Sequence, residues 1–183
     1  NDGLTNFEEQ LKHLAERPCR LLQIGAYTGD ASVWLYNNVL YYYTDSVLID
    51  VDTWEGSDEP AHHALNWTSV ETLYDTKTAP ARHNRQIVKY KGTSDSFFKN
   101  NVEKYDFIYI DGDHTSYGVI KDAVSAYECL NPGGIIAFDD YDWRGGDGPA
   151  DRPRMAIEAF LDIYRGKVEL ILRGYQLWVR KTN

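Results

Sequence analysis

Short runs of apolar residues alternate along most of the chain with stretches in which apolar residues recur every three or four positions. The runs are typical of buried β-strands, and the spaced stretches are typical of helices with one apolar face. Strands are predicted at residues 21–24, 47–49, 87–90, 107–110, 135–138, 168–172 and 175–179. Helices are predicted at residues 7–14, 30–35, 69–74, 119–130 and 155–164. This alternation favours a parallel sheet with helices on both faces.

The last two predicted strands differ from the others because only Arg173 and Gly174 separate them. A parallel crossover needs a dozen or more residues, so these two strands must be antiparallel. We therefore predict an α/β fold with a doubly wound, mostly parallel sheet that ends in an antiparallel hairpin. Residues 1–183 are expected to form one domain, with a polar and aromatic insertion at about 53–85 over the ligand face.

Composition and charge exclude several classes of protein. A chain of 183 residues with 43% hydrophobic and 26% charged residues suits a packed domain and not a disordered one. The net charge of −9 would repel a polyanion, so no nucleic-acid partner is expected. No apolar run approaches the roughly 18 to 20 residues that span a bilayer, and the first residues resemble no signal peptide. We expect no membrane association, a cytoplasmic location and buried thiols at Cys19 and Cys129; homo-oligomerisation is left open.

The turn after the first predicted strand, Gly25 to Gly29, is the first candidate for ligand binding. Ligands of open parallel sheets lie at the carboxyl ends of the strands, and glycines let backbone N–H groups approach them closely. A dinucleotide fingerprint would have glycine where Tyr27 stands, which disfavours an NAD-dependent oxidoreductase. A tight turn without a ligand is the alternative interpretation.

The second and third predicted strands end in polar residues that suit a nucleoside. Asp50 and Asp52 lie on the same face of the second strand, and a carboxylate there can accept both hydroxyls of a ribose. We select Asp52 because it lies at the strand exit; a solvated acidic strand end is the alternative. After the third strand, Thr93 or Ser94 can contact an adenine edge, although capping of the next helix also explains them.

Acidic residues follow both the fourth and the fifth predicted strands. Asp111 and His114 come after the fourth, and Asp139 and Asp140 come after the fifth. If these strands are neighbours, the carboxylates repel one another unless they keep protons or bind a hard cation such as Mg²⁺, Mn²⁺ or Ca²⁺. A solvated acidic rim is the competing interpretation. His114 can act as a base, as a further ligand, or as a neighbour of the next helix cap.

Five segments, taken together and in this order, resemble the class I S-adenosylmethionine-dependent methyltransferases. They are LLQIGAYTG at 21–29, DTWEG at 52–56, FIYIDGDH at 107–114, PGGIIAFDDY at 132–141 and GYQ at 174–176. The chain is most similar to a small stand-alone group related to metal-dependent O-methyltransferases of the macrocin and catechol type. The resemblance covers nearly the whole chain and implies a Rossmann-like fold with a seven-stranded sheet.

The resemblance also implies where S-adenosylmethionine binds. The glycine turn would hold the methionine part, Asp52 the ribose, and the turn at 92–94 the adenine. The implied cofactor-binding residues are Gln23, Gly25, Ala26, Tyr27, Gly29, Asp52, Thr93, Ser94 and Asp111. Gln23 departs from most of the family, which has an acidic residue at this position. An amide can hydrogen-bond the turn or a water, but it cannot neutralise the cofactor's amino group.

Catalysis is implied in the same way. In metal-dependent relatives the positions matched by Asp111, Asp139 and Asp140 bind a divalent cation, such as Mg²⁺, although not all members use a metal. The substrate hydroxyl, deprotonated by Asp111 or His114, would attack the sulfonium methyl in line. The resemblance therefore implies O-methylation of a small hydroxylated substrate, sugar-like or a secondary metabolite. A non-catalytic cofactor-binding module of the same fold is the alternative that Gln23 motivates.

Overall fold

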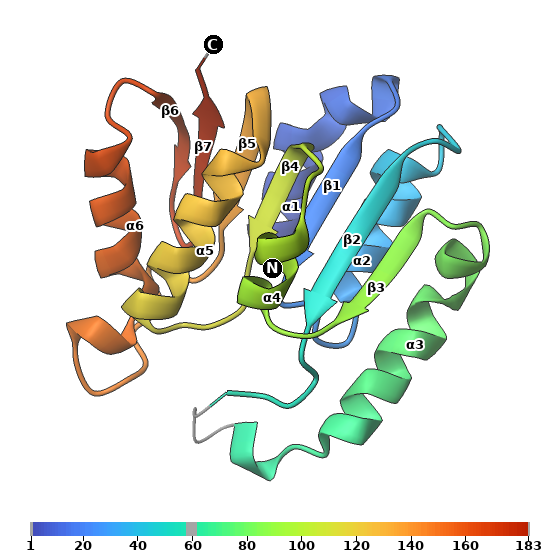
Figure 1. Ribbon diagram of the computed structural model, residues 1–183, viewed down its shortest axis with the longest axis horizontal. Coiled ribbons are helices and arrows are strands. Elements are labelled where there is room, and N and C mark those ends of the chain that lie inside the picture. The colour runs from blue at the N-terminus through green and yellow to red at the C-terminus, as the bar shows by residue number, and fades with distance from the viewer. Residues whose placement is uncertain (1, 58–61, 183) are drawn as a thin grey trace.

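The computed structural model describes residues 2–57 and 62–182, which form one seven-stranded sheet flanked by helices (Figure 1). The strands are β1 (Arg20–Ile24), β2 (Val47–Asp52), β3 (Ile87–Lys91), β4 (Tyr105–Ile110), β5 (Leu130–Phe138), β6 (Val168–Arg173) and β7 (Leu177–Lys181). The α-helices are α1 (Asp2–Leu11), α2 (Asp30–Leu35), α3 (Trp67–His83), α4 (Ser94–Asn100), α5 (Ser116–Glu128) and α6 (Pro153–Ile163). Within these ranges, no helix has both the length and the apolar character that crossing a membrane requires.

The strand order is β3-β2-β1-β4-β5-β7-β6. Strands β1 to β5 pair in parallel, and β7 runs antiparallel to both β5 and β6. The predicted α/β fold, a mostly parallel sheet with a C-terminal antiparallel pair, is thus confirmed. The last strand begins two residues later than predicted. The reason is a tight turn in which the N–H of Gly174 donates to the carbonyl of Gln176 at 2.8 Å.

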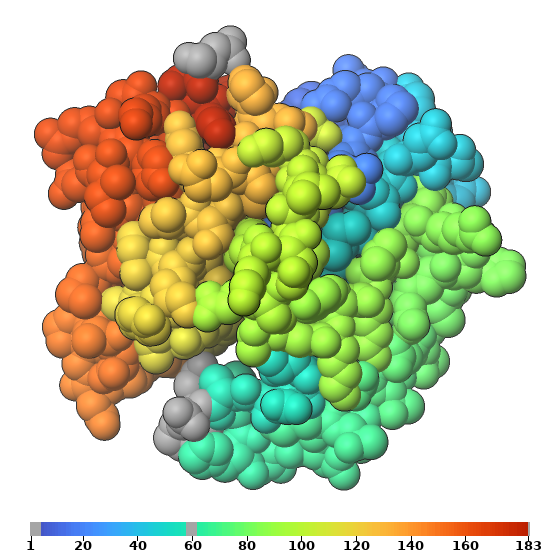
Figure 2. Space-filling model, in the orientation of Figure 1, coloured from blue at the N-terminus to red at the C-terminus, as the bar shows by residue number. Residues whose placement is uncertain are grey.

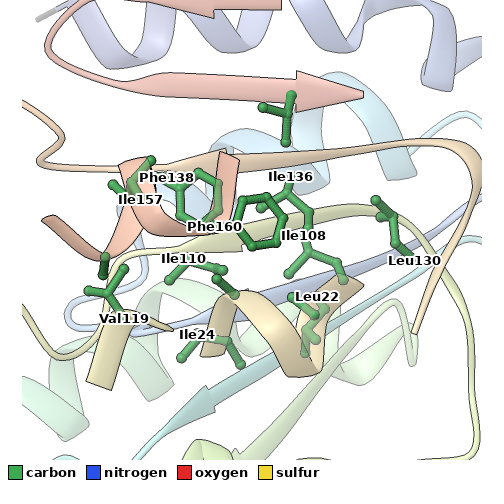
Figure 3. Packing of buried hydrophobic residues seen from close by; sticks show 14 of the residues in the cluster. Leu22, Ile24, Ile108, Ile110, Val119, Leu130, Ile136, Phe138, Ile157 and Phe160 are labelled. Carbon is green, nitrogen blue, oxygen red and sulfur yellow. The ribbon is translucent and has the colours of Figure 1, made fainter. Parts of the chain in front are cut away.

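Alternating side chains of the strands pack on opposite faces of the sheet. On one face, Leu22, Ile108 and Ile136 pack with residues of α5 and α6, such as Val119 and Phe160 (Figure 3). On the other face, the core includes residues of α1, α2 and the short helices that follow them: Phe7, Leu11, Leu14, Leu35 and Val39. Cys19 and Cys129 are free and buried, as predicted.

The segment at 53–85 is more regular than its polar sequence suggested. Helix α3 covers 17 residues of it and connects the parallel neighbours β2 and β3. The helix is capped by Asn66, whose side chain accepts from the N–H of Ser69. Its buried face includes a threonine, Thr78, and the helix contains Pro80, so the apolar signal is weak. Most of this segment is therefore a crossover helix. An insertion over the ligand face stays a prediction for residues 53–66, of which 58–61 lie outside the described residues.

Candidate functional site

The candidate site lies at the carboxyl ends of the parallel strands, which form the lower edge of the sheet in Figure 1. The chain runs from β1 outward to β3 and then crosses back to β4 on the other side of β1. Ligands of doubly wound sheets bind where the strand order reverses in this way. In Figure 2 the surface at this edge is open between the teal segment that follows β2 and the yellow-green residues around α4.

The glycine turn after β1 contacts the end of β4 closely. Gly25 has a φ of +86°, and a Cβ atom there would lie 1.9 Å from the carbonyl oxygen of Asp111. Gly29 has a φ of +81°, and its Cβ would lie 3.0 Å from the ring of Tyr74. Both glycines are therefore required by backbone conformation and packing, whether or not a ligand binds.

Gln23 is buried beneath this turn. Its Nε2 atom donates to the carbonyl of Gly25 at 3.0 Å, and its Oε1 atom accepts from the hydroxyl of Ser32 at 3.3 Å. A carboxylate could not donate to the Gly25 carbonyl. The amide thus suits this position, because it links the turn to α2 through one donor and one acceptor.

Asp52 binds the turn from the neighbouring strand. Its Oδ2 atom accepts from the N–H groups of Ala26 and Tyr27, both at 2.8 Å, and its Oδ1 atom accepts from the N–H of Trp54 at 2.7 Å. A carboxylate has about four acceptor positions, so these three bonds leave capacity for a ligand hydroxyl. The side chain of Tyr27 is half-exposed and meets Trp67 edge-on.

Asp50 has a different environment from Asp52. It is fully buried, and its Oδ2 atom accepts from the hydroxyl of Tyr74 at 2.7 Å. Burial raises the pKa of Asp50 to about 7. Of the two carboxylates that the sequence offered for a ribose, the geometry therefore favours Asp52.

Thr93 and Ser94 lie after β3 and have structural partners. The Thr93 hydroxyl accepts from the N–H of Ser96 at 3.2 Å and caps α4. Ser94 hydrogen-bonds Asp122, a buried carboxylate of α5 whose pKa is raised to about 6 by burial. The capping interpretation holds for Thr93, and contact of either residue with an adenine stays a prediction.

Asp111, His114 and Asp140 meet on the other side of the turn. One ligand atom from each of these side chains lies within 4.8 Å of the others. The Nε2 atom of His114 lies 2.9 Å from Oδ2 of Asp140 and 4.0 Å from Oδ1 of Asp111. Asp140 also accepts from the hydroxyl of Tyr175, and its φ of +55° is left-handed.

The pKa values of Asp111 and Asp140 are shifted from the ordinary value in opposite directions. Burial and the nearby charges of Asp139 and Asp140 raise the pKa of Asp111 to about 7, against the effect of His114. Burial also acts to raise the pKa of Asp140, but hydrogen bonds from His114 and Tyr175 hold it below the ordinary value. Near neutral pH, Asp111 can accept a proton while Asp140 remains ionised.

Asp139 is the predicted metal ligand that the structure does not place in this group. Its Oδ1 atom accepts from Nε2 of Gln176 at 2.9 Å, and burial followed by the charge of Asp140 raises its pKa. The Oε1 atom of Gln176 accepts from the indole of Trp178, which fixes the orientation of the amide. A set of two carboxylates and one imidazole still fits a divalent cation, with His114 in the place expected for Asp139.

Sequence reasoning gave no role to Tyr175 and Gln176, although both hold site carboxylates. A topological signal was available. Strand β7 runs antiparallel to β5, so the turn before β7 must lie at the edge where β5 ends. The partner that each turn residue selects there depends on side-chain packing, which the topology does not specify.

A family model described as a methyltransferase domain matches residues 22–141, more than half of the chain. The match spans the glycine turn, Asp52, the turn at 92–94 and the group around Asp111 and Asp140. No curated protein sequence matches the chain at a significant level.

Solved structures share the fold at low sequence identity. A putative rRNA-methylase from Clostridium thermocellum matches with a TM-score of 0.73 and 13% identity, over 98% of this chain and 96% of its own. The O-methyltransferase TomG from Streptomyces achromogenes, involved in tomaymycin synthesis and solved in complex with SAM, has a TM-score of 0.71 and 14% identity, over 100% and 80%. CalS11, a TDP-rhamnose 3′-O-methyltransferase of calicheamicin biosynthesis, matches with a TM-score of 0.66 and 15% identity, over 98% of this chain and 78% of its own.

Proposed function

The chain belongs to the methyltransferase-domain family, and from that premise we propose that it transfers the methyl group of S-adenosylmethionine to a hydroxyl of a small, sugar-like or secondary-metabolite substrate. One observation carries this proposal. The glycine turn and the Asp111 loop touch each other at Gly25, so a cofactor on the turn would lie beside the Asp111, His114 and Asp140 group. Donor and acceptor sites are then adjacent, as direct methyl transfer requires.

The cofactor contacts are assigned by position along this edge. The turn of Gly25, Ala26, Tyr27 and Gly29 would hold the methionine part, and Gln23 would act through the turn. Asp52 would bind a ribose hydroxyl through its remaining acceptor position, and Thr93 and Ser94 would lie against the adenine. TomG, a structural neighbour, was solved with SAM bound, which supports this cofactor.

The reaction needs little covalent chemistry from the protein. The substrate oxygen forms a bond to the methyl carbon while the bond from that carbon to sulfur breaks, which gives a methyl ether and S-adenosylhomocysteine. Without a bound cation, the hydroxyl proton passes to Asp111 or His114, and Asp140 keeps the imidazole of His114 in place. A divalent cation held by Asp111, His114 and Asp140 would supply orientation of adjacent substrate hydroxyls and a lower hydroxyl pKa.

The acceptor class is supported by charge and by one neighbour. The net charge of −9 opposes a polyanionic acceptor. CalS11 acts on a nucleotide-linked sugar. The C. thermocellum neighbour is described as a putative rRNA-methylase, so RNA belongs in the acceptor panel as a competing outcome.

Calorimetry with S-adenosylmethionine is the first test, followed by transfer of a labelled methyl group to a panel of sugars, phenols and RNA, with and without a chelator. We expect cofactor binding and methylation of a hydroxylated small molecule. We also expect about tenfold weaker cofactor binding to an Asp52→Asn variant, because the amide NH2 would face a backbone N–H donor of the turn in place of an acceptor oxygen. Absence of cofactor binding would refute the proposed function. Methylation of RNA alone would overturn the acceptor class.

A further inference from the structure

Trp54 is a buried residue of the turn after β2 that the proposed cofactor contacts do not use. Its side chain is 2% exposed. The indole Nε1 atom donates to the carbonyl of Tyr27 at 2.9 Å, and the backbone N–H donates to Asp52 at 2.7 Å. Trp54 therefore links the proposed ribose carboxylate to the centre of the glycine turn.

The residues joined by these bonds have unfavourable backbone conformations. Tyr27 has a φ of +46° and Trp54 a φ of +50°, in the left-handed region that side chains with a Cβ rarely adopt. Both backbone polar groups of Tyr27 are engaged, because its N–H donates to Asp52 and its carbonyl accepts from Trp54. Such conformations persist only where surrounding contacts hold them.

The indole of Trp54 is itself held by α3 and β3. Its ring centroid lies 4.7 Å from that of Tyr74, and the ammonium of Lys89 lies 4.5 Å from the ring centroid. Glu71 and Asp75 of α3 bind the same ammonium at 2.7 and 2.9 Å. The indole N–H is thus fixed in direction before any ligand arrives.

We propose that Trp54 is a positioning residue that keeps the glycine turn in the conformation that binds the methionine part of the cofactor. This inference rests on the proposed function, because it takes the turn as the cofactor site. Trp54 acts on the turn through the Tyr27 carbonyl. Its contribution therefore concerns ligands that carry the amino-acid part, and a nucleoside without that part does not depend on it.

The test compares two ligands in the Trp54→Phe variant, which keeps an aromatic ring and removes the indole N–H. S-adenosylhomocysteine carries the amino-acid part, and 5′-methylthioadenosine lacks it. We expect the variant to bind S-adenosylhomocysteine about fivefold more weakly, the effect of one neutral hydrogen bond, and to bind 5′-methylthioadenosine as the native protein does. At saturating S-adenosylmethionine, kcat should stay unchanged while KM rises.

Trp67→Phe is the matched control. It keeps an aromatic ring beside the ring of Tyr27 and removes a comparable indole bond, from Trp67 Nε1 to the His62 carbonyl at 3.2 Å, that does not reach the backbone of the glycine turn. We expect this variant to bind both ligands with native affinity. If Trp54→Phe lowers the affinities for both ligands equally, or lowers neither, the positioning role is wrong.

Two results separate this inference from the proposed function. Native protein that binds S-adenosylhomocysteine, together with an unaffected Trp54→Phe variant, overturns the inference alone. Native protein that binds neither ligand overturns the proposed function and the inference with it. If the variant does not fold, NMR of the native protein provides the test. The Trp54 indole resonance should shift when S-adenosylhomocysteine is added and should not shift with 5′-methylthioadenosine. If S-adenosylhomocysteine causes no shift, the positioning role is wrong.

Discussion

The candidate site has two halves, one around β1 and β2 and one around β4 and β5, and they consist of different chemical groups. Around β1 and β2, backbone N–H groups point to Asp52, and the apolar cluster of Ala26, Trp54, Val70 and Tyr74 lies nearby. Around β4 and β5, carboxylates and an imidazole contact one another, and their polar partners come from the distant β6–β7 turn. The first half is a turn whose N–H groups are bound by one carboxylate beside apolar side chains, and the second is a group of side chains that can carry charge and exchange protons.

The halves meet where Gly25 lies against Asp111, so a side chain at position 25 should disturb both. We expect Gly25→Ala to destabilise the protein by about 3 kcal/mol or more, because its Cβ would overlap the Asp111 carbonyl and φ is left-handed. Urea unfolding measures the loss. Gly133→Ala is the control: Gly133 has a φ of +75° but nothing within 4 Å of its Cβ, so a cost of about 1 kcal/mol is expected. Equal costs for the two variants would show that the close approach to β4 is unimportant.

The buried carboxylate of Asp50 allows the half around β1 and β2 to be tested by pH. An unfolded Asp titrates near pH 4 and the folded group near 7, so unfolding releases a proton between these values and the native protein loses stability as pH rises through this range. Asp50→Asn removes this loss. We expect its stability relative to the native protein to rise by about 3–4 kcal/mol from pH 4 to pH 8.

Thermal and urea unfolding at a series of pH values measure this difference. Asp45→Asn, at an exposed position, controls for the loss of one negative charge. A stability difference between Asp50→Asn and the native protein that stays constant with pH would contradict the raised pKa.

Tyr175→Phe, which removes a single hydroxyl, probes the half around β4 and β5. It removes the hydroxyl that donates to Asp140, so Asp140 and its partner His114 lose orientation. We expect kcat to fall about tenfold with no change in the affinity for S-adenosylmethionine, the reverse of Trp54→Phe. Steady-state kinetics together with calorimetry measure both values. Tyr117→Phe, at an exposed residue of α5, is the control. A parallel loss of cofactor affinity would show that the two halves do not act separately.

Apolar periodicity was enough to predict the sheet. The central parallel strands β1 and β4 are short, largely buried runs, whereas β3 at the sheet edge is mostly half-buried or exposed; the two-residue link at Arg173 and Gly174 required an antiparallel end. Periodicity was insufficient for α3, because the helix has a threonine at one core position and contains Pro80. Its length depends on the Asn66 cap and on packing against β3 and α2, which a local pattern shows poorly.

The sequence alone therefore determined which residues reach the functional edge, because parallel strands all end on the same side. It brought Gly25, Asp52, Asp111 and Asp140 there, and it favoured Asp52 over Asp50. Only the tertiary structure decided what each group does. Asp139 binds Gln176, 37 residues away, while Asp140 binds His114 and Tyr175. Burial and turn signals are local in the chain, whereas the hydrogen-bond partner of a carboxylate is set by which distant strands and turns pack beside it.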